Sequence, residues 1–295
     1  DSSGLTGYRH GFSFDGSENG VSFGRFQNSA DEEGFPSLER PTLGSANAAP
    51  RVPRIAISEL MYHPQALDGA EWVEIWNQTD QTIDLFDPDR PTNTWRLRGF
   101  DFNFPRGTSL GAGELAVVVG GDPEAFRLAN GLGTAAKIFG PVIGSLANGG
   151  ERVRLLRPDE PTLRDGVAVV PYIVEDSVTF ADFEPWPTEP DGEGPSLERM
   201  GGDGYSSEPS QWVSSAATGG SPGTIPGRLF VSVNTQGQGT VLQSPAGEVT
   251  AGESVTFTPQ PAPGWEFVSW AGGASGSSVP LVLTATDSIS IVATF

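Results

Sequence analysis

Histidine is the side chain that most often serves as a general base, and this sequence contains two, His10 and His63. A Ser-His-Asp triad needs such a base beside an activated nucleophile. His63 precedes Pro64 at the end of an apolar run, and no nucleophile-elbow sequence lies near it. We therefore expect His63 to be a capped or solvated strand-end residue, and we predict no catalytic residues in this chain.

Three glutamates, Glu59, Glu71 and Glu74, could serve as paired carboxylates in acid–base chemistry. Side chains alternate between the two faces of a strand, so Glu71 and Glu74 point to opposite faces and do not converge. We expect these glutamates to pair with arginines across neighbouring strands instead. Carboxylates held in that way have a structural role.

Two tryptophans, Trp72 and Trp76, flank Glu74 on one face of the same predicted strand. Indoles on an open strand face can stack on sugar rings, which makes Trp72, Glu74 and Trp76 candidate ligand-binding residues. Such a face is more often covered by another segment of the chain. Residues 1–50 are available to cover it.

Four acidic residues, Asp182, Glu184, Asp191 and Glu193, gather around Pro185–Pro187 and the glycine turns that follow it. Hard oxygen ligands on loops are what Ca²⁺ requires. Their spacing lacks the pattern of an EF-hand loop, so solvated loop acids are the alternative interpretation. We keep the four as candidate calcium ligands and predict no other cofactor.

The composition excludes several classes of protein. The chain has 295 residues, a net charge of −20 and no cysteine. Its acidic surface would repel nucleic-acid phosphates and anionic lipid. Disulfides and cysteine-based zinc sites are excluded, and no apolar run reaches the ~18 residues of a membrane span. Lys137 is the only lysine, which a saline source or a GC-rich genome that encodes arginine in place of lysine would each explain.

Short strands separated by glycine and proline turns place the chain in the all-β class. Ile55, Ile57 and Met61 mark one predicted strand. In a second predicted strand, Glu71–Asn77, Val73 and Ile75 point to one face. One helix is predicted over residues 122–129, with Asp122 as its cap and Pro123 in its first turn. These elements must position the candidate residues above.

Changes in composition divide the chain into residues 1–50, 51–227 and 228–295. The first part ends in a linker-like stretch, Ala46–Pro53. The last part is a small all-β domain, in which we expect Trp265, Phe267 and Trp270 to be core residues.

An internal repeat relates the first part to the end of the second. Ser22–Arg25 parallels Ser196–Arg199, and Thr42–Ser45 parallels Thr218–Ser221. Residues 1–50 are therefore interpreted as the closing end of a preceding copy of the central domain. The chain begins without Met and is interpreted as a fragment of a longer precursor.

A series of short motifs runs through residues 54–226. They are Ile57–Pro64, Glu71–Asn77, Phe104–Gly107 with Leu110–Gly113, Ser145–Glu151, Pro185–Pro187 and Asp191–Arg199. In this order they resemble the bacterial lamin-tail domain. The resemblance implies an immunoglobulin-like β-sandwich that accompanies secreted or surface proteins, and it supplies no catalytic residues.

Turn and core positions of residues 228–295 carry a second resemblance. They are Gly237–Val241, Pro245–Gly247, Gly252–Phe257, Gly264–Trp270 and Ala293–Phe295. They resemble the divergent InlB B-repeat type of bacterial surface module. The expected fold is thus a lamin-tail sandwich followed by a small C-terminal β domain.

We expect a non-catalytic structural or adhesive module, extracellular or at the cell surface, with proteins, glycans or neighbouring repeats as partners. Nucleic acid and direct membrane insertion are not expected. One alternative is a carbohydrate-binding module of an extracellular hydrolase, which requires exposed Trp72 and Trp76. Another is a metal-dependent hydrolase, which requires histidine and carboxylates that converge in a pocket.

Overall fold

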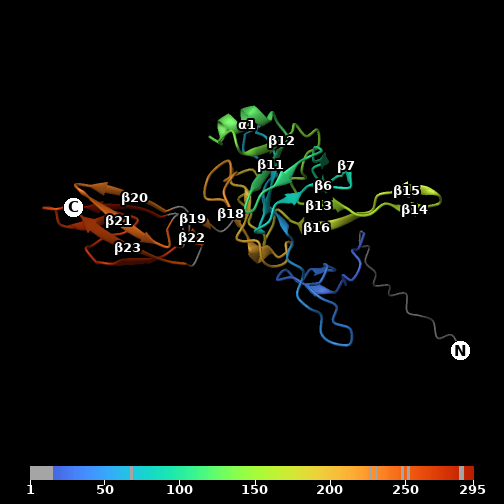
Figure 1. Cartoon of the computed structure of the whole chain (residues 1–295), viewed down its shortest axis with the longest axis horizontal. Coiled ribbons are helices and arrows are strands. Elements are labelled where there is room, and N and C mark those ends of the chain that lie inside the picture. The colour runs from blue at the N-terminus through green and yellow to red at the C-terminus, as the bar shows by residue number, and fades with distance from the viewer. Residues whose placement is uncertain are drawn as a thin grey trace. The chain divides into compact units, whose positions relative to one another are not determined.

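The structure is a computed structural model. It describes residues 16–66, 69–225, 228–229, 231–246, 249–250, 253–285 and 289–295. The chain divides into two compact units, residues 1–226 and 227–295 (Figure 1). Strands account for 42% of the residues and helices for 4%, which confirms the all-β class.

The first unit is a sandwich of two main sheets. One has the order β12 (Lys137–Phe139), β11 (Leu115–Val119), β4 (Trp72–Asn77), β3 (Ile55–Met61), β17 (Leu197–Arg199) and β18 (Trp212–Ser214). The other has the order β16 (Tyr172–Thr179), β13 (Arg152–Pro158), β8 (Arg96–Arg98) and β9 (Phe102–Asn103). β11 and β12 are parallel, and the other neighbouring strands of these two sheets are antiparallel.

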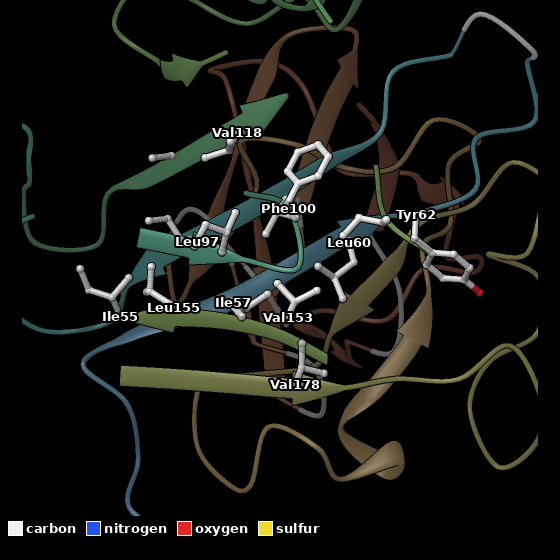
Figure 2. Packing of buried hydrophobic residues seen from close by; sticks show 14 of the residues in the cluster. Ile55, Ile57, Leu60, Tyr62, Leu97, Phe100, Val118, Val153, Leu155 and Val178 are labelled. Atoms are coloured by element: carbon white, nitrogen blue, oxygen red, sulfur yellow. The ribbon is translucent and has the colours of Figure 1, made fainter. Parts of the chain in front are cut away.

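The hydrophobic core lies between these two sheets. Figure 2 shows Ile55, Ile57 and Leu60 of β3 beside side chains from β8, β13 and β16 of the opposite sheet. Val73 and Ile75 of β4 also belong to this core, which confirms the alternation predicted for that strand. The six-stranded sheet therefore turns one face of each central strand inward.

A β-bulge at Ser58 shifts the alternation within β3. The pairing of β3 with β4 changes register between Ile57 and Glu59. Leu60 therefore enters the core after Ile57, and Met61 packs on the outer face. The extra residue reverses the side-chain direction that follows it, so Ile55 and Ile57 lie on the inner face of the strand and Met61 on the outer face.

The outer face of the six-stranded sheet is covered by α1 (Pro123–Ala129). Asp122 caps this helix by accepting a hydrogen bond from the Ala125 N–H at 2.8 Å, which confirms the predicted helix start. A second apolar cluster lies under it: Met61, Trp72, Val117, Val119 and Phe126. Both faces of this sheet are consequently buried near its centre.

Short two-stranded sheets complete the first unit: β1 (Phe26–Gln27) with β2 (Glu33–Gly34), β5 (Ile83–Asp84) with β10 (Ser109–Leu110), β6 (Phe86–Asp87) with β7 (Arg90–Thr94), and β14 (Thr162–Arg164) with β15 (Val167–Val169). The β14–β15 hairpin extends from the ends of β13 and β16 (Figure 1), and all its strand residues are exposed.

The described residues of the second unit form two three-stranded sheets and one short pair of strands. These are β20 (Val231–Gln236), β26 (Ile289–Thr294) and β24 (Ser269–Gly272); β21 (Gly239–Ser244), β23 (Ser254–Pro261) and β25 (Leu281–Thr284); and β19 (Arg228–Leu229) with β22 (Val249–Thr250). Trp270 lies in its core, and Phe267 packs partly against it. The core prediction was wrong for Trp265, which is 48% exposed because it lies in the turn before β24.

Candidate functional site

The predicted sugar-stacking face is not an open surface. Trp72 is 2% exposed and Glu74 is fully buried. The Trp72 indole packs edge-on against Phe126 of α1, with ring centroids 5.8 Å apart, and Gly220 lies close to the indole ring. Trp76 is half-buried beside Gly202. The cover comes from α1 and residues 202–223 and not, as expected, from residues 1–50.

Under that cover, three glutamates from neighbouring strands form a row, which we call the carboxylate row. Glu59 of β3 is opposite Glu74 of β4 on one side and opposite Glu198 of β17 on the other. Glu59 is 1% exposed, Glu74 is fully buried and Glu198 is half-buried. Side chains directly opposite on neighbouring strands lie about 5 Å apart at Cβ, so these carboxyl groups act on one another.

Glu59, at the centre of the carboxylate row, is held by two serines. The Ser196 hydroxyl donates a hydrogen bond to it, and the Ser221 N–H donates another at 2.7 Å. The Ser221 hydroxyl lies 3.1 Å from an oxygen of Glu59 and 3.1 Å from an oxygen of Glu198. Ser221 thus bridges two carboxyl groups of the row.

Both oxygens of the Glu74 carboxyl group accept hydrogen bonds. The Ser58 hydroxyl donates to one oxygen at 2.8 Å, and the Gly223 N–H donates to the other at 2.5 Å. Ser58 reaches Glu74 because the bulge in β3 turns it toward the outer face. The expected arginine partners for Glu59 and Glu74 were therefore wrong: hydroxyl and backbone donors take that place.

Burial controls the protonation of the carboxylate row. It raises the pKa of Glu59 to about 7, although the hydrogen bonds from Ser196 and Ser221 oppose the shift. Burial, and next the charge of Glu59, raise the pKa of Glu74 well above its ordinary value. Burial also raises the pKa of Glu198. The row consequently retains protons near neutral pH.

Glu71 lies apart from the carboxylate row, as its alternation predicts. Its carboxylate accepts a hydrogen bond from the Leu146 N–H at 2.6 Å. Burial raises its pKa, and the charges that act on it are those of Glu151 and His63. Glu71 and Glu74 therefore belong to different environments.

A buried ion pair joins the two sheets on the inner side. Arg199 Nη1 of β17 lies 3.3 Å from Asp176 Oδ2 of β16, and both side chains are almost completely buried. The same Asp176 oxygen accepts a hydrogen bond from the Ile57 N–H at 2.7 Å. Burial raises the pKa of Asp176, and the charge of Arg199 opposes that shift. This pair fixes β16 to β3 and β17.

The structure does not bring the four calcium candidates together. Asp191 Oδ1 lies 2.6 Å from His63 Nδ1. Asp182 is half-buried, and Glu184 and Glu193 are exposed. Within the described residues, no group of three or more histidines, aspartates or glutamates could hold a metal ion. The four carboxylates therefore do not converge on a common site.

His63 lies at the end of β3 beside Asp191. The Gly192 N–H donates to the His63 carbonyl at 3.2 Å, and the His63 side chain is 39% exposed. This is the capped, partly solvated position that the sequence predicts. His10 lies outside the described residues.

Residues 16–53 dock against the sandwich of the first unit at β16 and at residues 205–208. The contacts are Asn28 Nδ2 to the Ser207 carbonyl at 2.9 Å, the Ser29 N–H to Glu208 at 3.1 Å, Glu18 to Arg157 at 2.7 Å, and the rings of Phe26 and Tyr205 at 5.0 Å. A cavity of about 410 Å³ remains between these parts. Its lining includes Arg152 and Arg157 as well as Val21 and Ile173, so it is neither purely apolar nor purely charged.

The docked segment folds like the closing hairpin of the sandwich. Its Leu38 N–H donates to the Ser22 carbonyl at 2.8 Å, and Ser215 donates in the same way to Ser196 at 2.9 Å. An antiparallel β-bridge pairs Phe23 with Ser37, and the antiparallel pairing of β17 with β18 places Leu197 opposite Ser214 in the same way. The first repeated motif, Ser22–Arg25 and Ser196–Arg199, therefore has the same backbone pairing in both copies.

Comparison with protein families finds two matches in the chain. Residues 48–172 match the lamin tail domain, and residues 229–295 match the divergent InlB B-repeat domain. The predicted arrangement of the two is confirmed. β17 and β18 lie beyond the first match and complete its sheet. No match was found among curated proteins or among solved structures.

Proposed function

We propose that this chain, which contains a lamin tail domain followed by a divergent InlB B-repeat domain, is a structural and adhesive module of a secreted or cell-surface protein. Both are families of non-catalytic modules, and the lamin tail domain has an immunoglobulin-like fold. The B-repeat type is typical of surface proteins, which supports the proposed location. No helix among the described residues is long and apolar enough to cross a membrane.

The observation that carries the proposal is the docked segment at residues 16–53. It repeats the closing hairpin of the lamin tail domain and contacts β16 through hydrogen bonds, an ion pair and an aromatic contact. A closing hairpin that docks on the next sandwich is what a tandem array of such repeats requires. Neighbouring repeats are therefore the first partners that we propose.

The motif glutamates support a structural role. Glu59 and Glu74 are buried, and backbone and hydroxyl donors occupy their oxygens. A catalytic acid or base must reach a substrate, and these two do not. The carbohydrate-binding alternative loses the surface on which it depended, because Trp72 is buried. Binding of glycans stays a prediction without assigned residues.

Surface labelling of intact producing cells tests the proposed location. Antibodies against this chain should label the cells without permeabilisation, and added protease should remove the signal. A cytoplasmic protein probed in the same samples controls for lysis. Signal that appears only after the cells are opened would contradict a surface module.

A further inference from the structure

The segment that closes the sandwich crosses directly over the carboxylate row. We call residues 217–225 the strap. It is anchored where the Gly219 N–H donates to the Gly194 carbonyl at 2.8 Å. Its Ser221 and Gly223 N–H groups then donate to Glu59 and Glu74 at 2.7 and 2.5 Å. The strap therefore uses the row itself as its attachment site.

The fit between strap and row leaves almost no space. Gly220 has a φ of +84°, a backbone conformation that favours glycine. A Cβ atom at this position would lie 2.6 Å from Trp72 and 2.7 Å from a carboxylate oxygen of Glu59. With the strap in place, water has little access to the centre of the row.

Among the described residues, no ion pair joins a basic side chain to the carboxylate row, and the charges that act on Glu59 and Glu74 are those of other glutamates in it. The strap contains no ionisable side chain. On the covering helix, Arg127 pairs with Glu124 at 3.1 Å, and on β12 Lys137 pairs with Glu114 at 2.7 Å. Arg199 of β17 pairs with Asp176 on the inner side of the sheet. Full ionisation of the row would thus place like charges side by side without a basic partner.

We propose that the strap is a proton-dependent clasp, closed over Glu59 and Glu74 while the carboxylate row holds a proton and released when the row is fully ionised. Opening would let water solvate the charges and separate them from the apolar cover.

The direction of the switch follows from proton linkage. Burial raises the pKa of Glu59 to about 7 and that of Glu74 well above its ordinary value. Hydrogen bonds from the strap oppose these shifts, but burial outweighs them. The closed state therefore binds protons more tightly than an open, solvated state, and a rise in pH through about 7 favours opening.

Hydrogen exchange of the full chain tests the clasp. We expect the Ser221 and Gly223 amide hydrogens, corrected for intrinsic exchange, to lose at least about tenfold in protection between about pH 6 and about pH 8.5. The amides of β23 (Ser254–Pro261) should keep their protection, since that strand belongs to the second unit and the carboxylate row belongs to the first.

Charge-removing variants decide whether the row is responsible. Glu74→Gln mimics the protonated side chain, so its strap should remain protected at both pH values. Glu198→Gln, at the half-buried end of the row, should weaken the pH dependence in the same direction and supplies the test if Glu74→Gln fails to fold. Glu71→Gln is the matched control, because Glu71 binds Leu146 outside the row. Equal protection of the wild-type strap at both pH values would overturn the proposal. So would an unchanged pH dependence in the row variants.

Discussion

Glu59 and Glu74 are opposite each other on β3 and β4, and one backbone segment hydrogen-bonds to both. The bulge at Ser58 sets the register that places Glu59 opposite Glu74. It also turns the Ser58 hydroxyl toward Glu74, to which that hydroxyl donates a hydrogen bond. Residues from separate motifs of the lamin tail domain thus form one buried polar network. That network makes the stability of the first unit depend on pH.

We predict that the first unit becomes less stable as the pH rises from about 5 to about 7.5. An unfolded glutamate ionises near 4.5, whereas the pKa of folded Glu59 is about 7. Between these values the folded state holds the additional proton, so stability is present below the window and is lost as pH rises through it. A shift of this size corresponds to about 3 kcal/mol. Calorimetry at several pH values measures the transition of the first unit.

Three other glutamates make the folded state less stable at acidic pH. Hydrogen bonds and nearby charges lower the pKa values of Glu18, Glu189 and Glu208, and the stability that these groups contribute is lost as pH falls through their folded pKa values. The test window therefore stays above about pH 5. A melting temperature of the first unit that increases from pH 5 to 7.5 would contradict the proposed role of Glu59.

Local sequence patterns predicted much of the fold. Alternation placed Val73 and Ile75 in the core, and Asp122 with Pro123 marked the start of α1. These features depend on neighbours a few residues away, so the sequence reports them directly. The order of the motifs also indicated both domain families.

The carboxylate row could not be predicted in the same way. Strict alternation in β3 does not reveal a bulge at Ser58, because no glycine or proline marks it. Glu198 joins the row from a distant strand, and Ser221 reaches it from a loop. Burial of Trp72 likewise depends on α1, which folds back over β4. The usable signal was that glutamates and serines recur in three of the motifs: Ser58 with Glu59, then Glu74, and Ser196 with Glu198.

We predict that Arg199→Leu destabilises the first unit by about 3–5 kcal/mol, because it leaves Asp176 charged and buried without its partner. Urea unfolding followed by tryptophan fluorescence measures the loss. Arg164→Leu, in the exposed β14–β15 hairpin, is the control and should change stability by less than about 0.5 kcal/mol. Equal effects of the two substitutions would show that the ion pair does not join the sheets.

Docking of residues 16–53 predicts energetic coupling between Phe26 and Tyr205. Their rings lie 5.0 Å apart in an edge-to-face arrangement. A double-mutant cycle with alanine at both positions should give a coupling energy of about 0.5–1.5 kcal/mol. The pair Phe26→Ala and Leu163→Ala should be additive, because Leu163 is exposed on β14. No coupling in the first cycle would argue against a specific contact between repeats.

Two adjacent glycines allow the fit of the strap to be tested against backbone strain alone. Gly219 and Gly220 have φ values of +93° and +84°, so alanine is strained at both positions. A Cβ atom at Gly219 meets nothing within 4 Å, whereas one at Gly220 meets Trp72, Glu59 and Ser196 within 3 Å. We therefore predict that Gly220→Ala costs about 1–3 kcal/mol more than Gly219→Ala.

Thermal unfolding of both variants at about pH 6, where the strap is expected to be closed, gives this difference directly. The common strain cancels between the two, so what remains reports the contact of the strap with the carboxylate row and the indole. Equal melting temperatures would mean that the strap does not pack on Glu59 and Trp72. A clasp at this position would then have no structural basis, because the same close contact is what keeps water from the row.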